Sequence, residues 1–355
     1  MKYYSFILSN YCDYKPLNIK GSSCNASLID NNIYLSRCTN YTFLEPSYKK
    51  KYKLGRHLWF NDSIWTDEKL YNNDFSFIKN LTTSNEHHKQ ASGAEDFRII
   101  KWNNENYGLY SNVIIPFKKN EIHLCKITNN LEIKDDKKII TNGKTEKNWQ
   151  PIENIPFKCI YSYKPFCLID LNTANITEIK QNIFNTNYRG STQIIKFEDY
   201  NLGIIHERKE NNKEHYYIHY FVLFDNNMNF LKISKPFSFL GVDIEFCTYI
   251  SYKNKKIKII ASVNDQISFE FNLTKNIIFD SFNNTLNNTN IIPNLYDKLY
   301  YIAKDNKNIL TAICISTFSN NKDIISDAII LNYNSSLSQK KKEIIQKILL
   351  EKYQK

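Results

Sequence analysis

The sequence predicts an all-β fold, a five-bladed β-propeller followed by a C-terminal amphipathic α-helix. Short β-rich runs recur between Asn, Asp, Gly and Lys turn residues, and almost nothing before residue 335 keeps a helical period. No sequence repeat is detectable, and such regular antiparallel units are more typical of a propeller with divergent blades than of one sandwich. At roughly sixty residues a blade, the length indicates about five blades.

The strands are expected to pair as hairpins around short polar turns. In chain order the expected units are 27–41 around 30–32, 97–110 around 103–105, 193–207 around 198–201, 216–230, 244–271 and 299–332. We therefore assign residues 1–335 to the propeller.

The last segment, residues 336–355, has a different pattern. Ile344, Ile345, Ile348 and Leu349 fall on one helical face, with lysines around them. We expect this basic amphipathic helix to pack on the propeller, although the same pattern also fits a membrane-surface anchor or a helix that docks a protein partner.

Composition and charge narrow the class of protein. Hydrophobic residues at 42% exclude a disordered chain, and the net charge of +11 favours anionic partners such as phosphates, nucleotides or an acidic membrane face. No nucleic-acid-binding motif accompanies this charge, so we expect no nucleic-acid partner. Without an apolar run long enough for a signal peptide or a membrane span, a cytoplasmic location is expected, with peripheral membrane attachment as a variant.

The segment 93–100 contains the strongest candidate site. Glu95, Asp96 and Arg98 place two carboxylates and a guanidinium at the mouth of the hairpin 97–110. Such a cluster is costly to bury without partners, which is typical of a polar ligand site. An isolated Glu-Asp-x-Arg would instead be an ordinary turn with an exposed ion pair.

Further polar residues lie at predicted strand ends downstream. They are Lys147, Arg189, His206, Arg208, Glu245 and Asp265. Each is weak alone, because charged residues at strand ends are usually solvated. No group of His, Asp, Glu or Cys has metal-ligand spacing, so no metal is expected. The order of these residues along the chain is the stronger signal.

In this order the chain resembles the five-bladed propeller enzymes of glycoside hydrolase family 130, which are β-mannoside phosphorylases and related mannosidases, and the related propeller β-mannosyltransferases. The family's Gly-x-Glu-Asp-Pro-Arg segment and its later motifs match Glu95, Asp96, Arg98, Lys147, His206, Glu245 and Asp265, and its opening strand matches residues 25–29 with Arg37, Asn40 and Tyr41. The resemblance spans residues 25–271. It departs from the family at Phe97, which replaces the Pro, at Lys164, which replaces an Arg before Pro, and in the motif at 262–265, which keeps only the Asp.

The resemblance implies an inverting glycosyl transfer, namely β-mannoside phosphorolysis or the reverse β-mannosyl transfer, with Asp96 as the general acid and base. The implied substrate-binding residues are Glu95, Arg98, Asn40, Trp102, Glu245 and Asp265, and the implied phosphate-binding residues are Arg37, Lys147, Arg189, His206 and Arg208. Trp59 and Trp149 are further candidates to stack on a sugar face.

The chemistry requires an acid for the leaving oxygen and a nucleophile on the opposite face of the sugar. Phosphate is already anionic and needs no second carboxylate as base, so one acid and a cluster of cations are enough. We therefore expect no cofactor beyond phosphate or a sugar phosphate as co-substrate, and an oligosaccharide or sugar phosphate as partner. Two alternatives remain open: a nucleotide-sugar or lipid-linked glycosyltransferase at a membrane surface, and a non-catalytic glycan-binding propeller.

Overall fold

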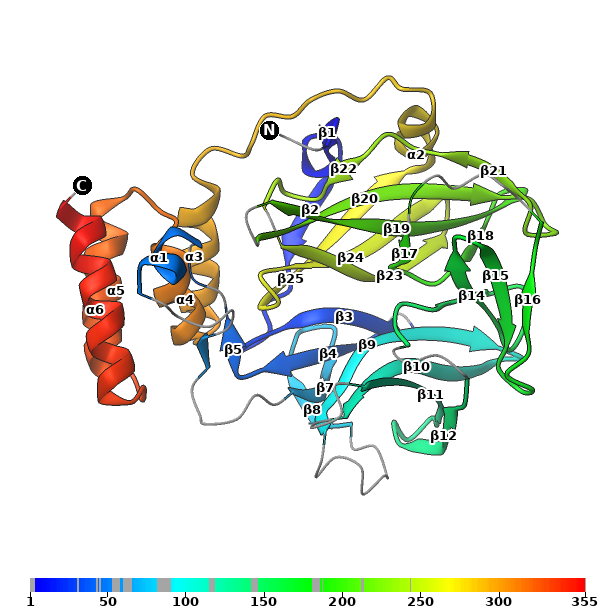
Figure 1. Cartoon of the computed structure of the whole chain (residues 1–355), viewed down its shortest axis with the longest axis horizontal. Helices are drawn as coiled ribbons and strands as arrows, with labels where there is room; N and C mark the ends of the chain where they lie inside the picture. The colour runs from blue at the N-terminus through cyan, green and yellow to red at the C-terminus, as the bar shows by residue number, and fades with distance from the viewer. Residues whose placement is uncertain are drawn as a thin grey trace.

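A computed structural model describes most of the chain. The described residues are 4–30, 32–42, 44, 46–52, 58–59, 66–81, 91–114, 119–141, 146–180, 186, 188–211, 214–242 and 244–354. In this part of the chain the strands form several sheets in a propeller-like arrangement, and most of the helices lie together on one side of it (Figure 1).

Four sheets have the regular four-stranded form of a propeller blade. The first contains β3 (Cys24–Ile29), β4 (Ile33–Thr39), β7 (Thr66–Asn72) and β8 (Phe77–Asn80). The second contains β9 (Ala91–Trp102), β10 (Glu105–Ile114), β11 (Lys119–Ile127) and β12 (Ile133–Ile139). The third contains β13 (Gln150–Pro151), β14 (Lys158–Tyr163), β15 (Phe166–Asp170) and β16 (Ile176–Glu178).

The fourth regular sheet joins the two ends of the strand region. It contains β23 (Glu245–Lys253), β24 (Lys256–Val263), β25 (Ile267–Thr274) and the N-terminal β2 (Asp13–Pro16). The N-terminal strand β2 is antiparallel to β25 and forms the edge of this sheet. Pairing with β2 covers the edge that β25 would otherwise present and joins both ends of the strand region in one sheet.

The strands between the third sheet and β23 form a wider, seven-stranded sheet. It contains β17 (Arg189–Gly190), β18 (Ile195–Phe197), β19 (Tyr200–Asn211), β20 (Glu214–Phe224), β21 (Phe230–Ile233), β22 (Phe237–Ser238) and the N-terminal β1 (Phe6–Ile7), which is followed by a 3₁₀ turn, Leu8–Asn10. The small strands β5 (Tyr41–Thr42) and β6 (Leu58–Trp59) pair separately.

The propeller-like fold is therefore confirmed, whereas the prediction of five regular blades is corrected to four. The pairing of β1 and β22 extends the remaining strands beyond the blade pattern. The hairpins predicted at 27–41, 97–110 and 193–207 are all present.

The helices were underestimated by the sequence analysis. They are α1 (Pro46–Lys51), α2 (Lys275–Phe282), α3 (Leu295–Asp305), α4 (Ile309–Ser316), α5 (Lys322–Asn334) and α6 (Gln339–Gln354). The prediction of strands at 299–332 is wrong, because α3, α4 and α5 occupy this segment. Buried residues follow a helical period in α3, as Leu295, Leu299 and Ala303 do, whereas α4 is buried on all sides and its apolar run resembles a strand.

The helix predicted at the C-terminus is present as α6, the last of a group that includes α3, α4 and α5 (Figure 1). Its residues Ile345, Ile348 and Leu349 are buried in one hydrophobic cluster with residues of α3, α4 and β23–β25. The helix is therefore confirmed, but within the described part of the chain it packs on α5 in the helical group and not directly on the sheets, which corrects the prediction that it packs on the propeller. Among the described residues, no helix is long and apolar enough to cross a membrane.

Candidate functional site

Asp96 lies at an irregular position of β9. The pairing of β9 with β10 shifts register between Leu109 and Ser111, and Asp96 there has a left-handed backbone with φ of 58°. Such a conformation costs about 1–3 kcal/mol unless the surroundings hold it, although Asp tolerates it better than most residues. Strained backbone of this kind is typical of functional sites.

Two residues of the first sheet hold the Asp96 carboxylate. Asn25 donates from Nδ2 to Oδ1 at 2.5 Å, and the Arg37 Nη1 lies 3.6 Å from the same oxygen. Asn25 is also left-handed, with φ of 48°, and its own Oδ1 accepts a 2.8 Å hydrogen bond from Ser262 Oγ. This bond fixes the orientation of the amide, so that its NH₂ group faces Asp96.

Glu95 lies between two cations. Arg37 Nη2 donates to one carboxylate oxygen at 2.7 Å and Lys147 Nζ donates to the other at 2.9 Å. Burial works against the charge of both cations, but the neighbouring carboxylates, Glu95 first, raise the pKa of Arg37 well above its usual value and also raise the pKa of Lys147. Arg37 and Lys147 were predicted to bind phosphate. In the structure both pair with the Glu95 carboxylate.

Arg98 is a scaffold of the site. Its guanidinium is buried and donates to the main-chain oxygens of Asp96, Gly190 and Ser191 and to the side chain of Asn148. These bonds tie the Asp96 main chain to the seven-stranded sheet at Gly190 and to the loop before β13 at Asn148. Direct substrate binding by Arg98 stays a prediction.

His206 is buried and neutral. Its Nδ1 pairs with Ser191 Oγ at 2.8 Å, and its ring packs against Phe246. Burial, with smaller contributions from His219 and Arg189, lowers the pKa of His206 well below 6.5, so it does not supply the positive charge expected of a phosphate ligand.

Two exposed arginines lie near His206 in the seven-stranded sheet. Arg189 is directly opposite His206 in the β17–β19 pairing, and Arg208 follows two residues later on β19. Because side chains alternate along a strand, all three lie on one face of the sheet. These arginines retain the exposure that an anion-binding role requires.

Glu245 is a structural carboxylate. It is fully buried and accepts hydrogen bonds from Ser238 Oγ and from the main-chain nitrogens of residues 239, 240, 241 and 242. Burial raises its pKa, and these hydrogen bonds counteract the increase. Its oxygens hold the loop between β22 and β23, and sugar binding by Glu245 stays a prediction.

Trp102 lies far from Asp96. It ends β9, about 20 Å along the strand from Asp96, and its indole donates to the Ile152 carbonyl in a buried position. Trp149 is likewise buried and donates to Glu146. The side chain of Trp59 lies outside the described residues.

Asn40 and Asp265 lie beside the Arg37 end of the cluster. Asn40 is buried between β4 and β5. Asp265 is left-handed in the turn between β24 and β25, and its main-chain oxygen accepts from Thr39 Oγ1 at 3.4 Å. Asp265 also contributes to raising the pKa of Tyr41, after burial, and the Tyr41 hydroxyl contacts Arg37.

Sequence reasoning missed Glu68. This residue is on β7, directly opposite Arg37 on β4, and its side chain is buried. The sequence signal that could have identified it is the alternation of Thr66, Glu68 and Leu70 with the charged Asp67 and Lys69, a strand pattern that the sequence analysis did not assign.

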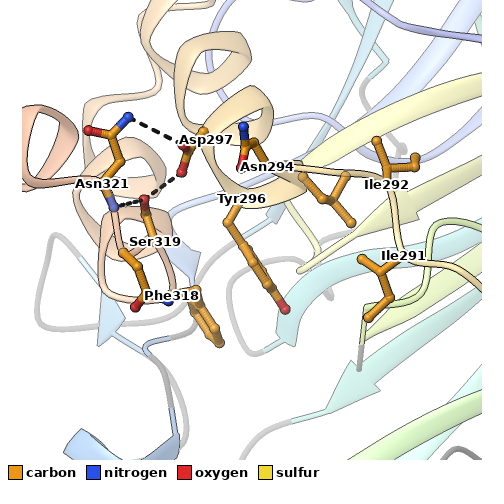
Figure 2. A pocket seen from close by; sticks show the side chains of 10 residues that line it. Ile291, Ile292, Asn294, Tyr296, Asp297, Phe318, Ser319 and Asn321 are labelled. Carbon is orange, nitrogen blue, oxygen red and sulfur yellow. Dashed lines mark hydrogen bonds between the residues drawn. The ribbon is translucent and has the colours of Figure 1, made fainter.

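A cavity of about 500 Å³ lies elsewhere, at the N-terminal end of α3 and the loop before α5 (Figure 2). Tyr296 and Phe318 stack on each other in its wall, and Asp297 accepts from Ser319 and Asn321. No predicted site residue lines it. Among the described residues, no group of three His, Cys, Asp or Glu side chains has a metal-binding arrangement.

Comparison with known proteins supports the fold. No family model matches the chain, and no curated protein matches it in sequence. Among solved structures, a β-1,2-mannobiose phosphorylase from Listeria innocua is 13% identical, with a TM-score of 0.52 over 76% of this chain and 93% of that chain. A mannose phosphorylase from Leishmania mexicana is 11% identical, with a TM-score of 0.48 over 76% of this chain and 91% of that chain. The first similarity places the chain among β-propellers and is limited to the fold.

Proposed function

We propose that the chain is a carbohydrate-active enzyme that catalyses inverting glycosyl transfer, as β-mannoside phosphorolysis or its reverse, with Asp96 as the general acid and base. The observation that supports this proposal is the geometry of Asp96, a left-handed carboxylate held by Asn25 and Arg37 beside the Arg37–Glu95–Lys147 cluster. The order of these motifs, and the fold shared with a protein named as a β-1,2-mannobiose phosphorylase, agree with it.

In this mechanism Asp96 donates a proton to the leaving oxygen, while phosphate attacks the anomeric carbon from the opposite face. Glu95 pairs with both Arg37 and Lys147 and keeps Arg37 against Asp96. Arg189 and Arg208 are the candidate ligands of the phosphate, because their guanidinium groups are exposed on one face. Asn40 and Asp265 remain candidates to bind sugar hydroxyls. In the reverse direction the same groups extend a glycan from a sugar 1-phosphate.

The test is phosphate release from mannose 1-phosphate with mannose and mannobiose as acceptors. The wild type is expected to release phosphate and Asp96→Asn to lose at least about a hundredfold in rate, since general acid catalysis contributes that much or more. Asp67→Asn is the matched control, because it changes an exposed aspartate of β7. Full activity of Asp96→Asn would contradict the assignment.

The wild type and Asp96→Asn also distinguish the enzyme from the alternative, a non-catalytic glycan-binding propeller. Mannobiose binding in calorimetry by wild type and Asp96→Asn alike, without phosphate release by either, would favour it. The membrane-surface alternative is weakened by α6, whose residues Ile345, Ile348 and Leu349 are buried in the protein.

A further inference from the structure

Glu68 is a buried carboxyl for which the proposed chemistry has no role. Its side chain is 5% exposed, and its Oε1 has no hydrogen-bond partner. A buried ionised carboxylate needs a matched cation and hydrogen-bond donors. Its nearest cation, Arg37, lies opposite in the β4–β7 pairing.

Arg37 is already occupied by other groups. Its Nε donates to Thr66 Oγ1, and its Nη2 donates to Tyr41 and to Glu95. Its Nη1 lies 3.6 Å from the Asp96 carboxylate. These contacts leave an ionised Glu68 without a matched cation.

With Asp96 ionised, the charges of the cluster balance without Glu68. Arg37 and Lys147 are two cations, and Glu95 and Asp96 are two carboxylates. An ionised Glu68 would add an unmatched negative charge, near the carboxylates of Glu95 and Asp96 on β9 and of Asp67 on its own strand. Burial raises the pKa of Glu68 well above 4.5, and Arg37 offsets only part of this increase.

We propose that Glu68 is a third carboxyl of the site and that it is protonated at neutral pH. It acts as a positioning residue, because a neutral Glu68 does not compete for the Arg37 guanidinium, which then pairs with Glu95 and Asp96. With a neutral Glu68 the net charge of the cluster is zero while Asp96 is ionised and positive when Asp96 carries the proton that it donates, so an anion can approach. Only this last consequence rests on the proposed function, through its anionic co-substrate.

The first experiment is infrared difference spectroscopy of the full chain at neutral pH, wild type minus Glu68→Gln. We expect the C=O stretch of a protonated carboxyl, with a downshift in D₂O. A carboxylate stretch in the difference spectrum would overturn the proposal. If Glu68→Gln does not fold, Glu68→Met supplies an uncharged side chain of similar length, and Asp67→Asn controls for an exposed carboxylate.

The second experiment measures sulfate binding by calorimetry as the pH is raised. Sulfate is the probe because its charge does not change in the neutral range. Wild-type affinity is expected to fall on the order of tenfold when Glu68 ionises, and the affinity of Glu68→Gln is expected to stay constant. The same pH dependence in both proteins would contradict the role of Glu68 in anion access.

The two proposals can fail separately. A protonated carboxyl in the difference spectrum without sulfate binding or phosphate release would support the state of Glu68 and count against phosphorolysis. Phosphate release that depends on Asp96, with an ionised Glu68 in the spectrum, would support the enzyme and overturn the inference.

Discussion

At the scale of single residues, Arg37 connects the parts of the charge cluster. It contacts Thr66, Tyr41, Glu95 and Asp96, which come from three separate sheets. Its side chain is 6% exposed and that of Glu95 is 14% exposed, so the pair is largely removed from water. Removal of one member of such a pair leaves the other charge buried without a partner.

We therefore expect Arg37→Ala to lower the free energy of unfolding by about 3–5 kcal/mol, measured by urea denaturation at neutral pH. Lys101→Ala is the matched control, because its ion pair with Asp30 is about half exposed and such pairs contribute about 1 kcal/mol or less. Equal losses in the two variants would show that burial of the Arg37 pair has no energetic consequence.

At the scale of elements, β19 and β20 carry a pair of buried histidines. His206 and His219 are directly opposite each other in the strand pairing, and the His219 ring packs against the rings of Phe237 and Phe239. Burial lowers the pKa of His219 to about 3, and a main-chain interaction at Glu245 offsets only part of this shift. The pKa of His206 is lowered as well.

These shifts predict a loss of stability in acid. Below pH 6.5 the unfolded chain binds protons at both histidines while the folded chain does not, so the free energy of unfolding falls as the pH decreases towards about 3. His219 alone should account for about 2 kcal/mol between pH 7 and pH 5. In urea denaturation, His219→Leu is expected to lose that much less than wild type over this interval.

Phe221→Leu on the same strand provides the comparison, because it changes a buried ring without a titratable group. Its cost in stability should be the same at pH 7 and pH 5. If wild type and His219→Leu respond identically to acid, His219 is not a buried neutral histidine.

At the scale of the whole molecule, closure of the strand region depends on the N-terminal segment. Strand β2 completes the sheet of β23–β25, and β1 joins the seven-stranded sheet beside β22. Both segments lie more than 200 residues from their partners in the chain, so their pairing closes long loops and carries the entropic cost of doing so.

A chain that begins at Leu17 is therefore expected to lose much of its stability and to associate through the exposed edge of β25. Thermal unfolding and light scattering measure the two effects. A peptide of residues 4–16 added in trans should restore the transition and reduce the scattering. Unchanged unfolding of the shortened chain would show that closure does not depend on β1 and β2.

The sequence was sufficient for the predominant β class and for the hairpins, because strand alternation and turn residues are local signals. It also identified Asp96 and its neighbours Glu95, Arg37 and Lys147, which the structure brings together. It failed at 299–332, where Ile-rich helices resemble strands in composition. Local patterns do not report which elements pack over a segment.

Only the tertiary structure separated the charged residues by role. Arg98, Glu245 and His206 appear in the sequence as polar residues at strand ends, yet the fold buries all three against internal partners. The fold also placed Glu68 opposite Arg37 and recruited β1 into a wider sheet in place of a fifth regular blade. The sequence by itself determined the secondary structure signals and the type of each charged group. The burial and the partners of each charge depend on contacts between distant sheets, which set the local dielectric and the available hydrogen bonds.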